Sequence, residues 1–234
     1  MTGQFKSLKV ERIVEQTGVL HKRITERFPN SGLSKVVAEV LEVAQTTKER
    51  SVFVRQPIIW LRVLIFLLIA VIVFGVIGTL VSIGAPEESL EFFTFVQLVE
   101  SGINDVVFIG FAIFFLSSLE SRLKRKRAME AIDELRSLAH IIDMHQLTKD
   151  PEHYSIHRIR TPSSPEPLKD LHQLKRYLDY CTESLSLIGK LAAVYAQSLN
   201  DQIVLTAVNE IEDLTTGLSG KIWQKIMVVQ SIES

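Results

Sequence analysis

The feature that most constrains this chain is the run from Val63 to Pro86, which contains no charged side chain. As an α-helix, the apolar part of this run would be about 30 Å long, which matches the hydrocarbon core of a bilayer. A buried helix of a soluble protein rarely stays apolar on every side over such a length, and the run lies too far from the N-terminus to be a signal peptide. We therefore predict a transmembrane helix over residues 57–83, with Trp60 and Arg62 at the membrane interface.

A second apolar run extends from Val106 to Leu119 and is also free of charge. It would form only about 21 Å of helix, so the helix must extend toward its N-terminal side unless the bilayer thins. We predict a second transmembrane helix over residues 101–119, with its polar first turn among the lipid headgroups. In the alternative interpretation, Leu90–Val99 forms a short interfacial or re-entrant helix that leads into the span.

The charges around the two runs predict the orientation in the membrane. Basic side chains lie before the first run and after the second: Lys48, Arg50, Arg55, Arg62, Arg122, Lys124, Arg125, Lys126 and Arg127. The segment from Gly84 to Asp105 is acidic and has no Lys or Arg. Because basic flanks stay on the cytoplasmic side, we predict an inner-membrane protein with both termini in the cytoplasm and an outward-facing acidic connector over residues 84–100.

The overall composition excludes several other classes of protein. The chain has 26 Lys and Arg against 27 Asp and Glu, so it lacks the basic excess of a dedicated nucleic-acid-binding protein. Its hydrophobic content of 47% is too high for a disordered chain. Its one cysteine, Cys181, has no partner in the chain, which excludes a disulfide scaffold.

Outside the two runs, helical periodicity accounts for most of the sequence. Apolar residues at steps of three and four predict a helix pair in residues 1–56, and a similar pattern predicts that residues 120–150 continue the second span. Residues 151–168 form a predicted linker, because Thr161–Pro167 has three prolines in seven residues and cannot be helical inside. We expect these helices to form a cytoplasmic domain together with the C-terminal segment.

The most regular pattern lies in the C-terminal segment, residues 169–234. Its first half carries apolar residues that alternate at steps of three and four, which is the a/d pattern of a helix in a bundle or coiled coil. This heptad seam consists of Leu171, Leu174, Leu178, Cys181, Leu185, Ile188, Ala192, Tyr195 and Leu199. Asn200 and Asp201 are of the types that cap a new helix, so we favour a helical hairpin over one long helix with a local change of period. No strand pattern is present, and we predict an all-α fold.

We find no sequence motif for catalysis or cofactor binding. The patterns GxxxxGK[ST], GxGxxG and HExxH are missing, and Cys181 lies on the heptad seam, where a small core residue is expected rather than a nucleophile. His140, Asp143 and His145 are of metal-ligand types. On one helix, however, His145 would point about 140° away from His140, so a metal site would need ligands from other segments. We predict no catalytic residue, no metal site and no cofactor.

Three functions are compatible with these patterns. The first is a non-enzymatic membrane protein that acts as a scaffold or signalling module, either as a homo-oligomer or by binding a cytoplasmic protein. The second is a homo-oligomeric cation channel, in which Glu100, Asn104 and Asp105 form an acidic outer mouth. The third is a metal-dependent membrane enzyme that uses the region of His140. We favour the first, because the heptad seam is uninterrupted and catalytic motifs are missing.

Overall fold

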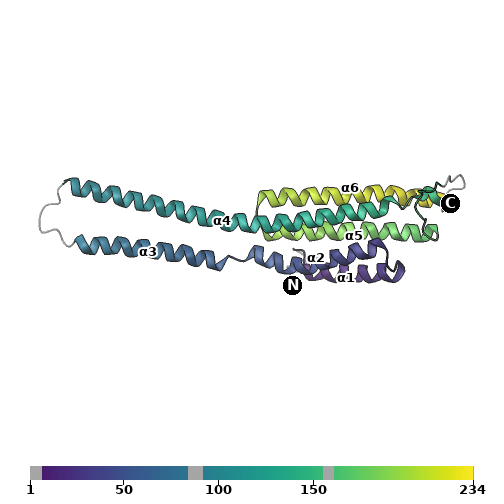
Figure 1. Cartoon of the computed structure of the whole chain (residues 1–234), viewed down its shortest axis with the longest axis horizontal. Helices are drawn as coiled ribbons and strands as arrows, with labels where there is room; N and C mark the ends of the chain where they lie inside the picture. Colours follow the sequence, from purple (N-terminus) through teal and green to yellow (C-terminus); the bar gives the residue numbers. More distant parts are fainter. Residues whose placement is uncertain (1–6, 84–91, 155–160, 234) are drawn as a thin grey trace. The chain divides into compact units, whose positions relative to one another are not determined.

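The structure is a computed structural model that describes residues 7–83, 92–154 and 161–233. Its helices are α1 (Val10–Arg27), α2 (Gly32–Arg55), α3 (Ile59–Ile83), α4 (Phe92–Leu147), η1 (Pro151–Tyr154), α5 (Leu171–Ser198) and α6 (Gln202–Glu233) (Figure 1). The described residues contain no strand. The predicted all-α fold class is therefore confirmed for the described part of the chain.

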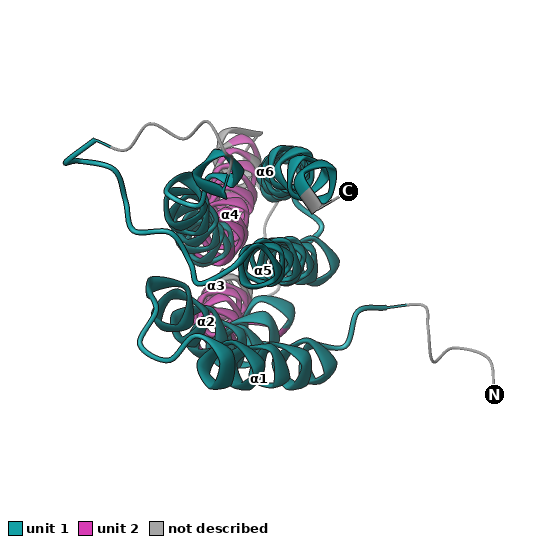
Figure 2. Cartoon of the chain, turned by 90° about the vertical axis from the view of Figure 1, so that its right-hand side faces the viewer, with its two compact units in different colours: residues 1–55, 125–234 teal, residues 56–124 magenta. Residues whose placement is uncertain are grey.

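The chain divides into two compact units (Figure 2). One unit combines residues 1–55 with residues 125–234, and we call it the helical bundle. The other unit consists of residues 56–124 and holds α3 with the first part of α4. The helix α4 contributes to both units, because it continues without a break from Phe92 to Leu147.

The helical bundle is built around α5, which packs against α1, α2 and α6. Seven of the nine seam residues are buried, and the two at the ends, Leu171 and Leu199, are half-buried. The helix also buries Tyr177, Tyr180 and Ser184, which lie off the seam. A helix with neighbours on several sides must bury more than the narrow a/d stripe that a two-stranded coiled coil requires.

A short turn separates α5 from α6. The N–H of Leu199 donates to the carbonyl of Tyr195 and closes α5. Asp201 then caps α6, because its Oδ1 accepts from the N–H groups of Ile203 at 3.0 Å and Val204 at 3.2 Å. Residues 169–234 thus contain two helices that pack on each other, the first of the two arrangements considered from the sequence.

The unit of residues 56–124 carries its apolar side chains on the outside. The stretches Gly32–Gly75 and Gly102–Tyr154, which extend beyond this unit, each contain a helical segment long and apolar enough to span a membrane. Only 11% and 0% of their most apolar windows are buried. Large side chains such as Phe74, 76% exposed, and Phe108, 72% exposed, face outward. These helices therefore differ from the core helix of a soluble protein, whose apolar residues are covered.

The second apolar run lies within a longer helix than the sequence predicted. The predicted span of residues 101–119 is an internal part of α4, which already begins at Phe92. From Phe92 onward, no break separates the stretch considered as a re-entrant helix from the span. Residues 84–91 of the predicted connector lie outside the described residues.

Candidate functional site

The candidate site is formed by α1 and α5, which run antiparallel and contact each other at both ends. At one end, the N–H of Leu8 donates to Oε1 of Gln197 at 3.1 Å. At the other end, the Phe28 ring meets the rings of Tyr177 and Tyr180 edge-on, with centroids 5.3 and 6.2 Å apart. Edge-to-face contacts of this kind stabilise a pair beyond the apolar area that it buries. The two helices are thus fixed on either side of a groove.

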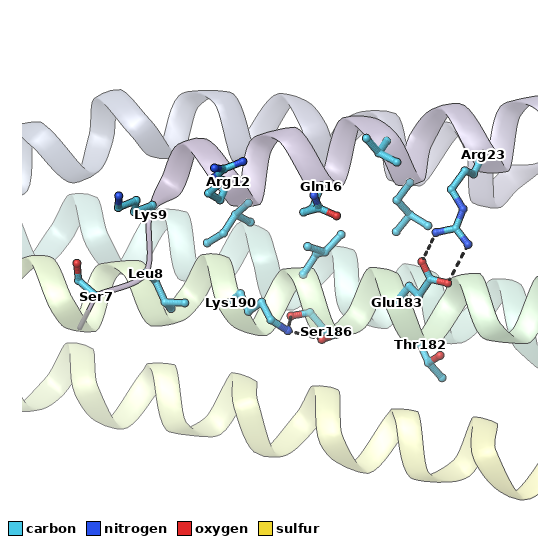
Figure 3. Close-up of a pocket in the computed structure, with 14 residues that line it drawn as sticks. Ser7, Leu8, Lys9, Arg12, Gln16, Arg23, Thr182, Glu183, Ser186 and Lys190 are labelled. Carbon is cyan, nitrogen blue, oxygen red and sulfur yellow. Dashed lines mark hydrogen bonds and ion pairs between the residues drawn. The ribbon is translucent and has the colours of Figure 1, made fainter. Parts of the chain in front are cut away.

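This groove has a volume of about 830 Å³ and an apolar floor. The floor contains Ile13 and Leu20 of the buried stripe of α1, together with Val19 and Leu187. Ser186, Thr182 and Gln16 add hydrogen-bonding groups along the walls (Figure 3). The combination of an apolar floor and a polar rim is typical of a surface that receives an amphipathic ligand.

The rim of the groove is predominantly cationic. Lys9, Arg12, Arg23 and Lys190 line it, and Glu183 is the one carboxylate among the described lining residues. Lys190 is exposed, and its Nζ donates to Oγ of Ser186 at 2.5 Å and to the Ser186 carbonyl at 3.3 Å. This places the ammonium group over the groove (Figure 3). The groove therefore favours a ligand that carries negative charge.

An ion pair closes one end of the groove. Arg23 donates through both terminal nitrogens to Glu183, at 2.7 and 3.4 Å, and its guanidinium also lies 5.1 Å from the centre of the Tyr180 ring. The hydrogen bond to Glu183 raises the pKa of Arg23 above its usual value. Since Arg23 is paired with Glu183 and Arg12 is paired with Glu15 at 3.0 Å, the excess positive charge of the groove comes from Lys9 and Lys190.

The residues considered as metal ligands do not form a ligand set. His140 is exposed, and Asp143 accepts a hydrogen bond from Nε2 of Gln146 at 2.7 Å. The ring of His145 instead packs against Gly32, where it occupies the position that a Cβ would take. Within the described part of the chain, no three His, Cys, Asp or Glu side chains are grouped so that they could hold a metal ion.

The residues considered as a pore mouth and as interface anchors lie on α3 and α4. Glu100, Asn104 and Asp105 are exposed, and so are Trp60 and Arg122. The other predicted interface residues form ion pairs: Arg62 with Glu120 at 3.8 Å, Lys124 with Glu120 at 2.7 Å, and Arg125 with Asp201 at 2.7 Å.

Glu120 has a positioning role that sequence reasoning missed. It pairs with Arg62 and Lys124, and its Oε1 accepts from the N–H of Ile58, just before α3 begins, at 3.3 Å. A carboxylate at a helix N-terminus satisfies backbone donors that have no partner inside the helix. One signal was available in the sequence, because Glu120 is the one acidic residue among the basic residues that follow the second apolar run.

Comparison with models of protein families, with curated proteins and with solved structures finds no match for this chain.

Proposed function

We propose that this protein is an integral inner-membrane protein whose two transmembrane helices anchor a non-enzymatic helical docking domain at the cytoplasmic side. The observation that carries the anchor is the outward exposure of apolar side chains along α3 and the first part of α4. In water, such a surface would be far larger than the apolar patches of ordinary monomers. In a bilayer, the same side chains are in contact with lipid and require no protein cover.

The charge distribution supports the proposed orientation. Lys48, Arg50 and Arg55 precede α3, and the basic cluster from Arg122 to Arg127 follows the apolar part of α4. Positively charged flanks remain on the cytoplasmic side of a membrane. The helical bundle, which these flanks join, would then lie in the cytoplasm.

The groove between α1 and α5 supports docking as the activity of the bundle. Along α1 it extends from Lys9 to Arg23, about 21 Å of helix. A groove of this length with an apolar floor suits an amphipathic helix, which inserts its apolar face and pairs its charges with the rim. The cationic rim selects a helix with acidic flanks.

Alkaline carbonate extraction of membranes tests the anchor. We expect the full-length protein to stay in the membrane pellet after carbonate and to be released only by detergent. Replacement of Leu67 and Phe74 by arginine should abolish membrane retention, because each arginine at the centre of a span costs about 3 kcal/mol. The matched control is Met144→Arg with Leu147→Arg, which places the same two charges on exposed sites of α4 in the helical bundle. Release of the unmodified chain by carbonate would refute the proposal.

A further inference from the structure

The helix α6 has an exposed stripe that no described part of the chain covers. Leu205, Trp223 and Met227 lie on it and are 42%, 58% and 48% exposed. Asn209, Glu212 and Thr216 lie between Leu205 and Trp223 on the same side of the helix. The six residues are spaced by three or four, except for one step of seven from Thr216 to Trp223, so all of them face one way. This spacing is that of a helix face that packs against other helices. We call these six residues the α6 stripe.

The α6 stripe carries one carboxylate, Glu212, and Asp213 lies beside it, whereas the rim of the groove is basic. Residues 202–220 contain no Lys or Arg, and they contain Glu210, Glu212 and Asp213. Glu210 is paired with Arg136 at 2.8 Å, whereas Glu212 and Asp213 are exposed. The molecule thus presents a cationic groove with an apolar floor, and a helix face with a carboxylate between its apolar ends.

We propose that the groove between α1 and α5 receives the α6 stripe of a second copy of this chain. The inference rests on the proposed docking function and names the partner of that site. In one copy, α5 lies between α1 and α6 (Figure 2), so α6 does not reach the groove of its own chain. The groove and the stripe can therefore meet only between copies.

The dimensions and chemistry of the two surfaces agree. From Leu205 to Met227 the stripe is about 33 Å long, so it can occupy the full length of the groove, which is about 21 Å. Glu212 lies near the middle of the stripe with Asp213 beside it, where the two carboxylates would meet Lys190 on the rim. Trp223 provides a large exposed aromatic anchor, the residue type that most often dominates the free energy of an interface.

The symmetry of such a contact is restricted. Because groove and stripe are different surfaces, two copies pair either twice across a two-fold axis or once in a head-to-tail arrangement. Further copies then extend the head-to-tail arrangement into a ring if the rotation closes, and into a filament if it does not. Both arrangements make the same prediction for defective variants. A copy with a defective groove and a copy with a defective stripe still form one intact contact with each other.

Charge reversal in the full-length protein tests the proposal. The groove variant is Lys9→Glu with Lys190→Glu, and the stripe variant is Glu212→Lys with Asp213→Lys. The matched control is Lys22→Glu, which reverses an exposed charge of α1 outside the groove. Association is measured in lipid nanodiscs or vesicles by energy transfer between labelled copies, and circular dichroism checks that each variant keeps its helix content.

We expect each double variant alone to associate at least about tenfold more weakly than the parent, because like charges would then face each other. An equimolar mixture of the two variants should recover association, and so should one chain that carries all four substitutions. Trp223→Ala should weaken association about 30-fold. The Lys22→Glu control should associate like the parent.

Three results would overturn the inference. They are a parent that stays monomeric in the membrane, double variants that associate as strongly as the parent, and a mixture of variants that does not recover association. None of them removes the membrane anchor, which carbonate extraction reports separately. Loss of carbonate resistance, in contrast, would refute the proposed function itself.

Discussion

Asp201, at the turn between α5 and α6, both caps α6 and pairs with Arg125, so its replacement should destabilise this end of the helical bundle. Its Oδ1 caps α6 through two backbone N–H groups, and its Oδ2 accepts from Arg125 Nε at 2.8 Å and Nη2 at 2.7 Å. Loss of an N-cap costs about 1 kcal/mol. A charged hydrogen bond is worth about 1.5 kcal/mol at the low end, which applies here because the Arg125 side chain is 37% exposed.

We therefore expect Asp201→Ala to lower the free energy of unfolding of the α5–α6 end by about 2.5 kcal/mol. Asp201→Asn should cost about half as much, because the amide oxygen still caps the helix while the charge is lost. Hydrogen exchange of the amides of residues 202–210 in the detergent-solubilised protein measures this opening directly. Asn200→Ala, the exposed neighbour, is the matched control.

The pH dependence of this effect has a defined sign. Burial acts to raise the pKa of Asp201, but the hydrogen bonds from Arg125 and from the N–H groups of Val204 and Ile203 outweigh it and hold the pKa below its usual value. A lowered carboxyl pKa stabilises the folded state above the unfolded-state value of about 3.9, and this stabilisation disappears as the pH falls through the folded-state pKa. The hydrogen-exchange protection of α6 should therefore be constant from about pH 5 to about pH 8 and decrease below about pH 4. Equal protection in Asp201→Ala and Asn200→Ala would refute this reasoning.

Three further predictions concern the interior of the helical bundle. Tyr195→Phe removes the buried hydrogen bond from the Tyr195 hydroxyl to Oγ1 of Thr47 at 3.3 Å, and chemical denaturation should show a loss of about 1 kcal/mol. Gly32→Ala places a methyl group where the His145 ring lies, so it should destabilise the bundle by about 1 kcal/mol in the parent. In a His145→Ala background the loss should be much smaller, and a double-mutant cycle measures the difference. Cys181 is fully buried and burial raises its pKa, so a maleimide should label it only after denaturation, and rapid labelling of the native protein would contradict the packing of α5.

The elements that sequence reasoning predicted well are those that depend on local pattern. The all-α class follows from apolar residues at helical spacing, and the two long apolar helices follow from the absence of charge after Val63 and after Val106. The start of α4 at Phe92 was less predictable, because Glu100, Asn104 and Asp105 interrupt the apolar run without interrupting the helix. Polar residues end a hydropathy pattern, but they do not end backbone hydrogen bonding.

The candidate site was not predictable in the same way, because it depends on which helices become neighbours. Lys9 and Lys190 are far apart in the sequence, and nothing in either local pattern indicates that they line one groove. Likewise, the heptad seam of α5 predicted one buried stripe, whereas Tyr177 and Ser184 are buried as well because α1, α2 and α6 all pack against this helix. The exposure of Trp223 could not be predicted without knowing which face of α6 is buried.

The central claim is that α3 and α4 cross the membrane with the connector outside and the helical bundle inside. Labelling of intact cells with a membrane-impermeant maleimide tests it, with one reporter cysteine at Glu88 in the connector and another at Lys22, an exposed residue of α1. Cys181 should give little background because it is buried. We predict that Glu88→Cys is labelled in intact cells and that Lys22→Cys is labelled only after permeabilisation. Labelling of both reporters, or of Lys22→Cys alone, in intact cells would contradict the account.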